Sequence, residues 1–136
     1  AEAAETVVST EPGVQYVWKN MPNESIHENA TLAAIAAHCA GNQNKFWEFH
    51  DSIFENQAFL SETTLFTIAQ DLELDMTSFQ NCYGSRETLP LVKQDYEEGL
   101  ALGITATPTI FINNKRYVGA MTSSELLTRI QQALAN

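Results

Sequence analysis

The chain has 136 residues, of which 44% are hydrophobic and 18% are charged. This length and composition suit one folded domain with a buried core and exclude a disordered chain. With 7 basic and 17 acidic residues the net charge is -10, which opposes binding to nucleic acids and anionic membrane surfaces. No apolar run approaches the roughly 20 residues that span a bilayer, so we predict no membrane insertion by this segment.

The N-terminal residues predict a helix followed by a strand. Apolar side chains recur at helical spacing over residues 1–10, and the pattern ends before Pro12-Gly13. Because the pattern begins in mid-helix, we expect the beginning of this helix to be missing from the chain. The segment from Val14 to Lys19 is rich in β-branched and aromatic residues, which predicts a strand.

Residues 28–84 predict four short amphipathic helices. Three apolar stripes at helical spacing mark the first three helices, and Ser61 is a candidate N-cap for the third. Asp75 is a candidate N-cap for the fourth, which carries Phe79 and Cys82. The stripes are formed by Leu32, Ile35, Ala36, Cys39 and Ala40, by Phe46, His50, Ile53 and Phe54, and by Leu65, Ile68, Ala69 and Leu72. We therefore expect a helical subdomain whose apolar faces cover one another.

The C-terminal part predicts a helix and a hairpin. Pro90 fits only the first turn of a helix, and Gly103 is a candidate C-cap at its end. The segment from Thr109 to Ile112 predicts a strand. Asn113-Asn114 tolerates positive φ and so favours a tight turn into a second strand at Tyr117-Val118.

A last amphipathic helix follows the hairpin. Thr122-Ser123-Ser124-Glu125 has the capping-box pattern, in which the first and last side chains bond each other's backbone N–H. The apolar stripe behind it consists of Leu126, Leu127, Ile130 and Leu134. No repeat or linker interrupts the chain. The pattern therefore predicts a single α/β domain with a helical insertion.

The two cysteines, Cys39 and Cys82, each lie on an apolar helical stripe. A reactive thiolate needs a helix N-terminus or a positive neighbour, and neither cysteine is placed in this way. We therefore assign no catalytic residue to this chain. Two alternatives remain for the pair, a structural disulfide or two buried free thiols.

Other residues that often carry chemistry have simpler interpretations in this sequence. His27, His38 and His50 lack the spacing of a metal site, so we predict no metal and no cofactor. The acidic run with Asp95, Glu97 and Glu98 is interpreted as a solvated face. A set of aromatic residues is interpreted as helical core rather than a ligand cage, namely Phe46, Trp47, Phe49 and Phe54.

Taken in order and spacing, several short segments resemble the DsbA-like thiol-disulfide oxidoreductases, thioredoxin-fold proteins of the thioredoxin-4 group. The resemblance implies a thioredoxin-like α/β fold, with residues 1–24 and 85–136 as the thioredoxin-like part and 25–84 as a helical insertion. The segments that carry it are Val14 to Lys19, Ser25 to Ala30, Cys39 to Gln43, Lys45 to Asp51, Asp95 to Gly99, Thr105 to Thr109 and Val118 to Ala120.

The resemblance also implies where the active site would lie. The family's Cys-x-x-Cys follows a strand and opens the first helix, and alignment places it just before Ala1. We therefore expect the first strand and the cysteine motif to be absent from this chain, which by itself should be inactive. Thr107-Pro108 matches the family's cis-proline loop, which implies a cis bond and a substrate-binding role for Thr107 and Pro108.

The implied function is disulfide exchange in extracytoplasmic client proteins, in the periplasm or at the cell surface. The implied partners are clients with cysteines or disulfides and a redox partner protein. One alternative is a redox-silent peptide-binding or chaperone module. Another is a domain-swapped dimer, or a complementing N-terminal fragment, that supplies the missing strand.

Overall fold

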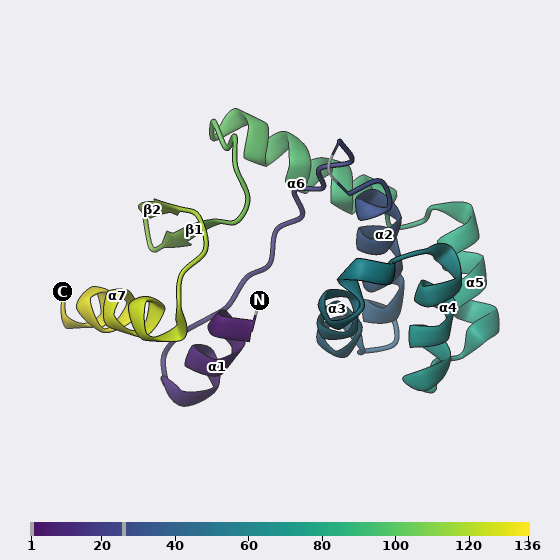
Figure 1. The fold of residues 1–136 in the computed structure, drawn as a ribbon, viewed down its shortest axis with the longest axis horizontal. Coiled ribbons are helices and arrows are strands. Elements are labelled where there is room, and N and C mark those ends of the chain that lie inside the picture. The colour runs from purple at the N-terminus through teal and green to yellow at the C-terminus, as the bar shows by residue number, and fades with distance from the viewer. Residues whose placement is uncertain (1, 26) are drawn as a thin grey trace. The chain divides into compact units, whose positions relative to one another are not determined.

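The structure is a computed structural model that describes residues 2–25 and 27–136 (Figure 1). Ala1, at which the expected helix and domain begin, and Ile26, in one of the segments of the resemblance, lie outside the described residues. The chain forms two compact units. Unit 1 consists of Ala1–Trp18 with Gly99–Asn136, and the helical unit is Lys19–Glu98. The insertion predicted at 25–84 falls inside the helical unit, and its boundaries stay a prediction.

The helical unit contains the four predicted short helices and most of a fifth helix, α6. Ser61 accepts a hydrogen bond from the backbone N–H of Thr64, and Asp75 accepts one from that of Ser78, which confirms both predicted N-caps. The elements are α2 (Ala30–Gly41), α3 (Phe46–Glu55), the 3-10 turn η1 (Gln57–Phe59), α4 (Glu62–Asp71), α5 (Met76–Ser85) and α6 (Leu89–Ala101), which continues into unit 1.

The core of the helical unit is built around α2. This helix is rich in alanine, whose small side chain lets neighbouring helices approach closely. The phenylalanines of the core lie on α3 and α5, where the rings of Phe49 and Phe79 are 5.7 Å apart and both residues are fully buried. The other largest fully buried side chains are Ile35, Leu65, Val92 and Cys39.

Unit 1 contains a helix, a β-hairpin and a second helix. Its elements are α1 (Glu2–Thr10), β1 (Thr109–Ile112), β2 (Lys115–Val118) and α7 (Ser123–Ala135). The strands are antiparallel, with Ile112 opposite Lys115, and Asn113 has a φ of 53° in the turn between them. The predicted capping box at the start of α7 is present. A small core joins these elements, with Val7 from α1 and Leu126 and Ile130 from α7 as its buried members.

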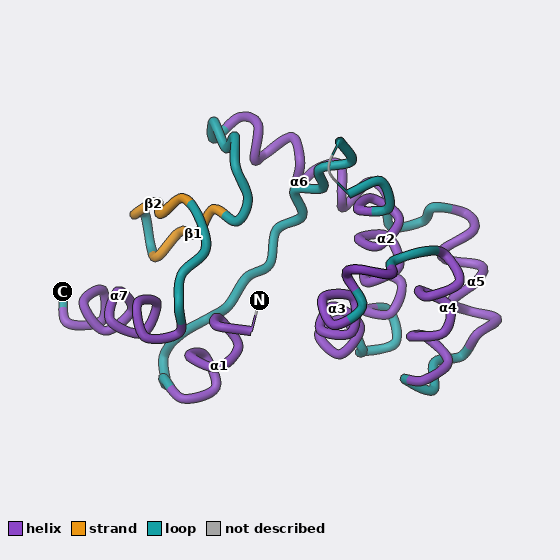
Figure 2. Tube along the Cα trace, viewed as in Figure 1, coloured by secondary structure: helices purple, strands orange, loops and turns teal. Residues whose placement is uncertain are grey.

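The predicted strand from Val14 to Lys19 is wrong in this structure. The segment is drawn as a loop in Figure 2, and the sheet that the described residues form contains β1 and β2 alone. Its side chains alternate between exposed and partly buried, as in an extended chain. A strand is defined by hydrogen bonds to a neighbouring strand, however, and the described residues form no strand that pairs with this segment. The β-branched and aromatic residues of this segment therefore give an extended conformation, but the segment does not pair with a neighbouring strand.

Candidate functional site

The loop that carries Thr107-Pro108 begins where α6 ends. Gly103, with a φ of 72°, donates its N–H to the Leu100 carbonyl at 3.0 Å, and Ile104 donates its N–H to the Gly99 carbonyl at 3.0 Å. These two bonds form a Schellman motif and confirm Gly103 as the residue that ends the helix. The guanidinium of Arg116 on β2 also donates to the Leu102 carbonyl. The start of the loop is therefore held from both the helix and the hairpin.

The end of the loop is held by the hairpin. The Thr107–Pro108 peptide bond is cis. The Pro108 carbonyl accepts the N–H of Gly119 at 2.8 Å, which extends the β1–β2 ladder by one bond. The hydroxyl of Thr109 donates to the Ala106 carbonyl at 2.6 Å. Both neighbours of Thr107 in the loop are thus engaged through their carbonyl groups.

Thr107 itself presents an open backbone. It is exposed, and no hydrogen bond to its N–H or C=O is found within residues 2–25 and 27–136. An exposed backbone unit beside a strand can pair with an extended peptide in the manner of an added strand. The loop can therefore bind peptide backbone, while the substrate-binding role of Thr107 and Pro108 stays a prediction.

The two cysteines form a disulfide between α2 and α5. Cys39 is 1% and Cys82 is 5% exposed, so neither sulfur is open to an external thiol. The side-chain amide of Asn42 donates to Cys82 Sγ at 3.6 Å, and Thr88 Oγ1 lies 3.8 Å from Cys39 Sγ. Of the two alternatives left by the sequence, the structure shows the disulfide. It lies in the core as a structural staple, a covalent link between α2 and α5.

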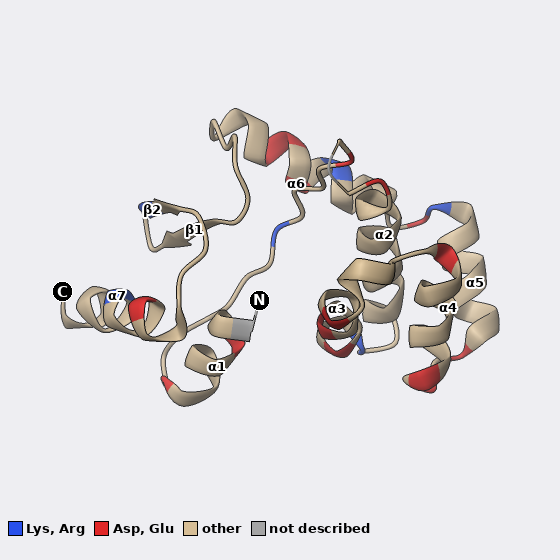
Figure 3. Cartoon of the chain, in the orientation of Figure 1, with Lys and Arg blue, Asp and Glu red and all other residues tan. Residues whose placement is uncertain are grey.

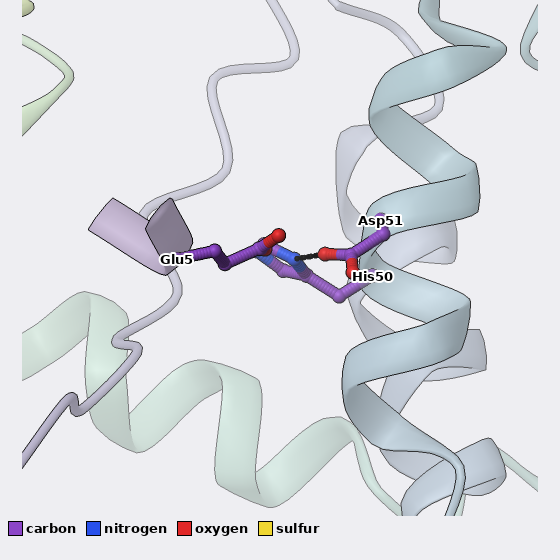
Figure 4. A group of neighbouring side chains, drawn as sticks. All are labelled: Glu5, His50 and Asp51. Carbon is purple, nitrogen blue, oxygen red and sulfur yellow. Dashed lines mark hydrogen bonds and ion pairs between the residues drawn. The ribbon is translucent and has the colours of Figure 1, made fainter. Parts of the chain in front are cut away.

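The three histidines have different surroundings. His27 is exposed, and His38 is partly buried with its Nε2 beside the side-chain amide of Asn20. His50 on α3 is buried, and its Nδ1 lies 3.1 Å from Asp51 Oδ1 (Figure 4). Burial lowers the pKa of His50 below its usual value, although the hydrogen bond that the imidazole donates to the Asp51 carboxylate raises it.

The aromatic residues assigned to the helical core divide into two groups. Phe49 is fully buried and Phe46 is partly buried, as expected. Trp47 and Phe54 are 37% and 41% exposed, so their assignment to the core is wrong. Their rings pack beside His50, with centroids 5.3 Å and 5.0 Å from the imidazole. The set of aromatic residues predicted as core therefore includes two residues that lie outside the buried face of α3.

Sequence reasoning missed a polar network in the helical unit. The sequence predicts Asp95 on α6 as part of a solvated face, but Asp95 is partly buried and accepts the backbone N–H of Asn20 at 3.0 Å. Lys19 Nζ lies 3.2 Å from Glu98 and 3.7 Å from Asp95. The partners are more than 70 residues apart in the chain, so no local pattern indicates the contact. Glu97 is exposed, as expected.

Acidic side chains are concentrated in the helical unit. Figure 3 shows most of the red acidic positions on α3 to α6 and on the loops between these helices. The prediction that the chain avoids nucleic acids and anionic surfaces rests on this excess of negative charge. None of the helices in the described part combines the length and the apolar character that a membrane crossing needs.

Comparison with known proteins gives relatives of two kinds. The Na(+)/H(+) antiporter NhaA 1 of Salinispora arenicola is 31% identical over 122 residues, and NhaA 3 of Salinispora tropica is 32% identical over 123 residues. Each match covers 90% of this chain and 19% of the antiporter, so the chain spans about a fifth of the length of these relatives. An NhaA antiporter of Herminiimonas arsenicoxydans is 32% identical over 107 residues.

The fold is that of a thioredoxin-like protein. A solved thioredoxin-like oxidoreductase from Silicibacter pomeroyi superposes with a TM-score of 0.83, covering 99% of this chain and 77% of that protein at 24% identity. The model of the thioredoxin-4 family, described as thioredoxin, matches residues 2–132. The predicted α/β fold with a helical insertion is confirmed by these matches. The chain therefore belongs to the thioredoxin-4 family and is a DsbA-like thioredoxin-fold protein.

Proposed function

We propose that this chain is the substrate-binding part of a thiol-disulfide oxidoreductase that acts on disulfides of extracytoplasmic proteins. The observation that carries the proposal is the open backbone of Thr107, next to a strand, in a chain of the thioredoxin family. An extended client segment would pair with this backbone and so place its own cysteine beside the loop. The buried disulfide supports an oxidising compartment, in the periplasm or at the cell surface.

The chemistry of exchange needs a thiolate that this chain does not supply. Cys39 and Cys82 are its two cysteines, and each sulfur is already bonded to the other. We propose that the reactive pair belongs to residues outside these 136. One thiolate of that pair would attack a client disulfide, release one client thiolate and form a mixed disulfide. The second thiol would then resolve it, so that the client is reduced and the pair is oxidised, or the reverse.

A second candidate function follows from the same observations. A chain with an open peptide-binding edge and no reactive thiol would serve as a redox-silent peptide-binding or chaperone module. The antiporter relatives match this chain over 19% of their length, so the ion transport in their names is not proposed for it. Client proteins and a redox partner protein are the partners proposed for the first candidate. A domain-swapped dimer or a complementing N-terminal fragment remains a proposal for either.

Peptide binding can be tested at Thr107. The variant Thr107→Pro removes the backbone N–H, whereas Thr107→Ala removes only the side chain. We expect Thr107→Pro to weaken binding of an extended, cysteine-free peptide by roughly tenfold, the value of one hydrogen bond of about 1.4 kcal/mol. Thr107→Ala should bind almost as the native chain does. Equal binding by all three proteins would contradict the proposal, with circular dichroism as the check on folding.

Exchange can be tested by the reduction of insulin. The 136-residue chain should reduce insulin at the background rate, because its cysteines are buried and paired. Reading the codons that precede Ala1 then separates the two candidates. A Cys-x-x-Cys encoded there, and turnover by the longer protein, would support the oxidoreductase. Turnover by the 136 residues that disappears in Cys39→Ala would instead make Cys39 the nucleophile.

A further inference from the structure

The side-chain amide of Asn20 connects two helices of the helical unit. Its Nδ2 lies 2.9 Å from Asp95 Oδ2 on α6 and 2.7 Å from His38 Nε2 on α2. Asn20 is 5% exposed, and its backbone N–H also donates to Asp95 Oδ2. A carboxylate oxygen only accepts hydrogen bonds, which fixes the amide with its nitrogen toward Asp95. The same nitrogen therefore faces the imidazole.

This geometry determines the proton state of His38. Because Asn20 Nδ2 is a donor, His38 Nε2 must accept, so the imidazole is neutral and carries its proton on Nδ1. A protonated imidazole would turn both of its nitrogens into donors and set two N–H groups against each other. Rotation of the amide by 180° would relieve that clash but would place its oxygen beside the carboxylate of Asp95. Neither orientation of Asn20 satisfies both neighbours once His38 is charged.

We propose that Asn20 is an acid-sensitive latch, which joins the segment Lys19–Asn20 to α2 while His38 is neutral and releases α2 once His38 takes up a proton. Released from Asn20, the imidazolium turns toward the charge of Asp95. The segment keeps its second attachment, because Lys19 stays beside Asp95 and Glu98 on α6. The latch lies where the chain enters the helical unit, since Lys19 is the first residue of that unit.

The electrostatic surroundings of His38 favour the neutral form. Burial lowers the pKa of His38 from its usual value of 6.5, and the charge of Asp95 offsets only part of this effect. On the side of α3 the imidazole meets the ring of Phe46, with centroids 5.1 Å apart, which adds no charge. Lys19 pairs with both Asp95 and Glu98, and of these three charged groups Asp95 is the one that acts on the pKa of His38. The latch is thus closed at neutral pH and has a titratable group at its centre.

The sign of the pH dependence follows from these groups. The unfolded chain binds a proton at His38 more readily than the folded chain does, so acid favours the unfolded or released state. The contribution of the latch to stability is complete above pH 6.5, the usual value for histidine, and is lost progressively as the pH falls below it.

Nuclear magnetic resonance of the oxidised chain tests the latch directly. At pH 7.5 the nitrogen shifts of His38 should identify the Nδ1–H tautomer. Between about pH 7.5 and 5, the side-chain amide signals of Asn20 should move with the same midpoint as the ring signals of His38. Hydrogen exchange at Asn20 Nδ2, corrected for the intrinsic effect of pH, should become roughly tenfold faster, as expected for one lost hydrogen bond. Protonation of His38 that leaves the Asn20 signals unmoved would overturn the proposal.

A matched pair of variants separates His38 from all other titrating groups. His38→Gln keeps a polar side chain but cannot be protonated, whereas His27→Gln makes the same change at an exposed histidine. The Asn20 amide should lose its pH response in the first variant and keep it in the second. A response that persists in His38→Gln would contradict the latch. If that variant does not fold, the titration of the native chain still decides. No redox activity enters the measurement, so its outcome is independent of the proposed exchange function.

Discussion

The helical unit and unit 1 differ in the size of their buried cores. The helical unit has a large core with Phe49 and Phe79 at its centre, and a disulfide joins two of its helices. In unit 1 the buried members of the core are Val7, Leu126 and Ile130, and the sheet has two strands. An isolated two-stranded hairpin is at best marginally stable in water. The comparison indicates that the helical unit sets the stability of the chain.

The two tryptophans allow this comparison to be measured. Trp18 is the last residue of the first segment of unit 1, and Trp47 lies on α3 in the helical unit. Replacing either one by phenylalanine leaves a fluorophore in a single unit, so that urea unfolding can be followed in each unit separately. A lower urea midpoint in the Trp18 signal than in the Trp47 signal would support the comparison. Coincident midpoints would mean that the units unfold together.

The largest effect is expected in the core of the helical unit. Phe49→Ala removes a fully buried ring and should lower the free energy of unfolding by about 3–5 kcal/mol. Phe59→Ala is the control, because Phe59 is 80% exposed and its loss should change stability by no more than about 0.5 kcal/mol. Urea unfolding at neutral pH gives both values. Equal losses in the two variants would show that Phe49 is not part of the stabilising core.

The second largest effect is expected from the disulfide. It closes a loop between residues 43 positions apart, for which the loop-entropy model gives a stabilisation of about 4 kcal/mol. Reduction of the native chain and the double variant Cys39→Ala/Cys82→Ala should lower the urea midpoint seen by Trp47 to a similar extent. A urea midpoint that does not change on reduction would show that the disulfide does not stabilise the helical unit.

The features that could be predicted from the sequence are local. Ser61, Asp75 and the Thr122–Glu125 box each bond a backbone group within three residues, so the pattern that predicts a cap also builds it. The hairpin around Asn113 is local in the same sense. In the candidate site, Gly103 and the position of Thr107 before a strand were predictable for this reason.

The features that the sequence did not reveal depend on contacts over long distances. The Val14–Lys19 segment has the composition of a strand, but pairing requires a neighbour that local composition cannot supply. The partner of Asn20 is Asp95, 75 positions away, and an acidic residue on an amphipathic helix ordinarily indicates a solvated face. For the two cysteines, local patterns indicated burial but could not choose between a bond and two thiols.

A smaller effect is expected at the start of α7 in unit 1. Thr122→Ala removes the hydroxyl that accepts the N–H of Glu125 and should cost about 1 kcal/mol, seen first in the Trp18 signal. Thr128→Ala is the control, because its hydroxyl bonds the Ser124 carbonyl within the helix and takes no part in the capping box. A larger shift in the Trp47 signal than in the Trp18 signal would contradict the assignment of α7 to a separately melting unit.

The same capping box predicts a pH dependence in unit 1. The backbone N–H of Thr122, and then its hydroxyl, lower the pKa of Glu125 below its usual value of 4.5. The folded chain therefore holds the charged carboxylate more strongly than the unfolded chain does. The contribution of this carboxylate to stability is complete above pH 4.5 and is lost as the pH falls below that value. Glu125→Gln should abolish this pH dependence. An unchanged acid profile in Glu125→Gln would show that the box does not contribute.

The smallest effect is expected from the ion pair between Lys19 and Glu98 in the helical unit. The two side chains are 57% and 51% exposed, and exposed pairs contribute about 0.2–1 kcal/mol because water and salt screen them. Glu98→Gln should therefore lower the urea midpoint seen by Trp47 only slightly, and the difference should disappear in about 1 M salt, where the screening length is about 3 Å. Glu97→Gln makes the same change at the exposed neighbouring residue and should have no effect at either salt concentration. If Glu98→Gln still lowers the urea midpoint in high salt, Glu98 stabilises the Lys19–Asn20 segment by packing rather than by charge. The stability of the helical unit would then depend on surface residues as well as on its core.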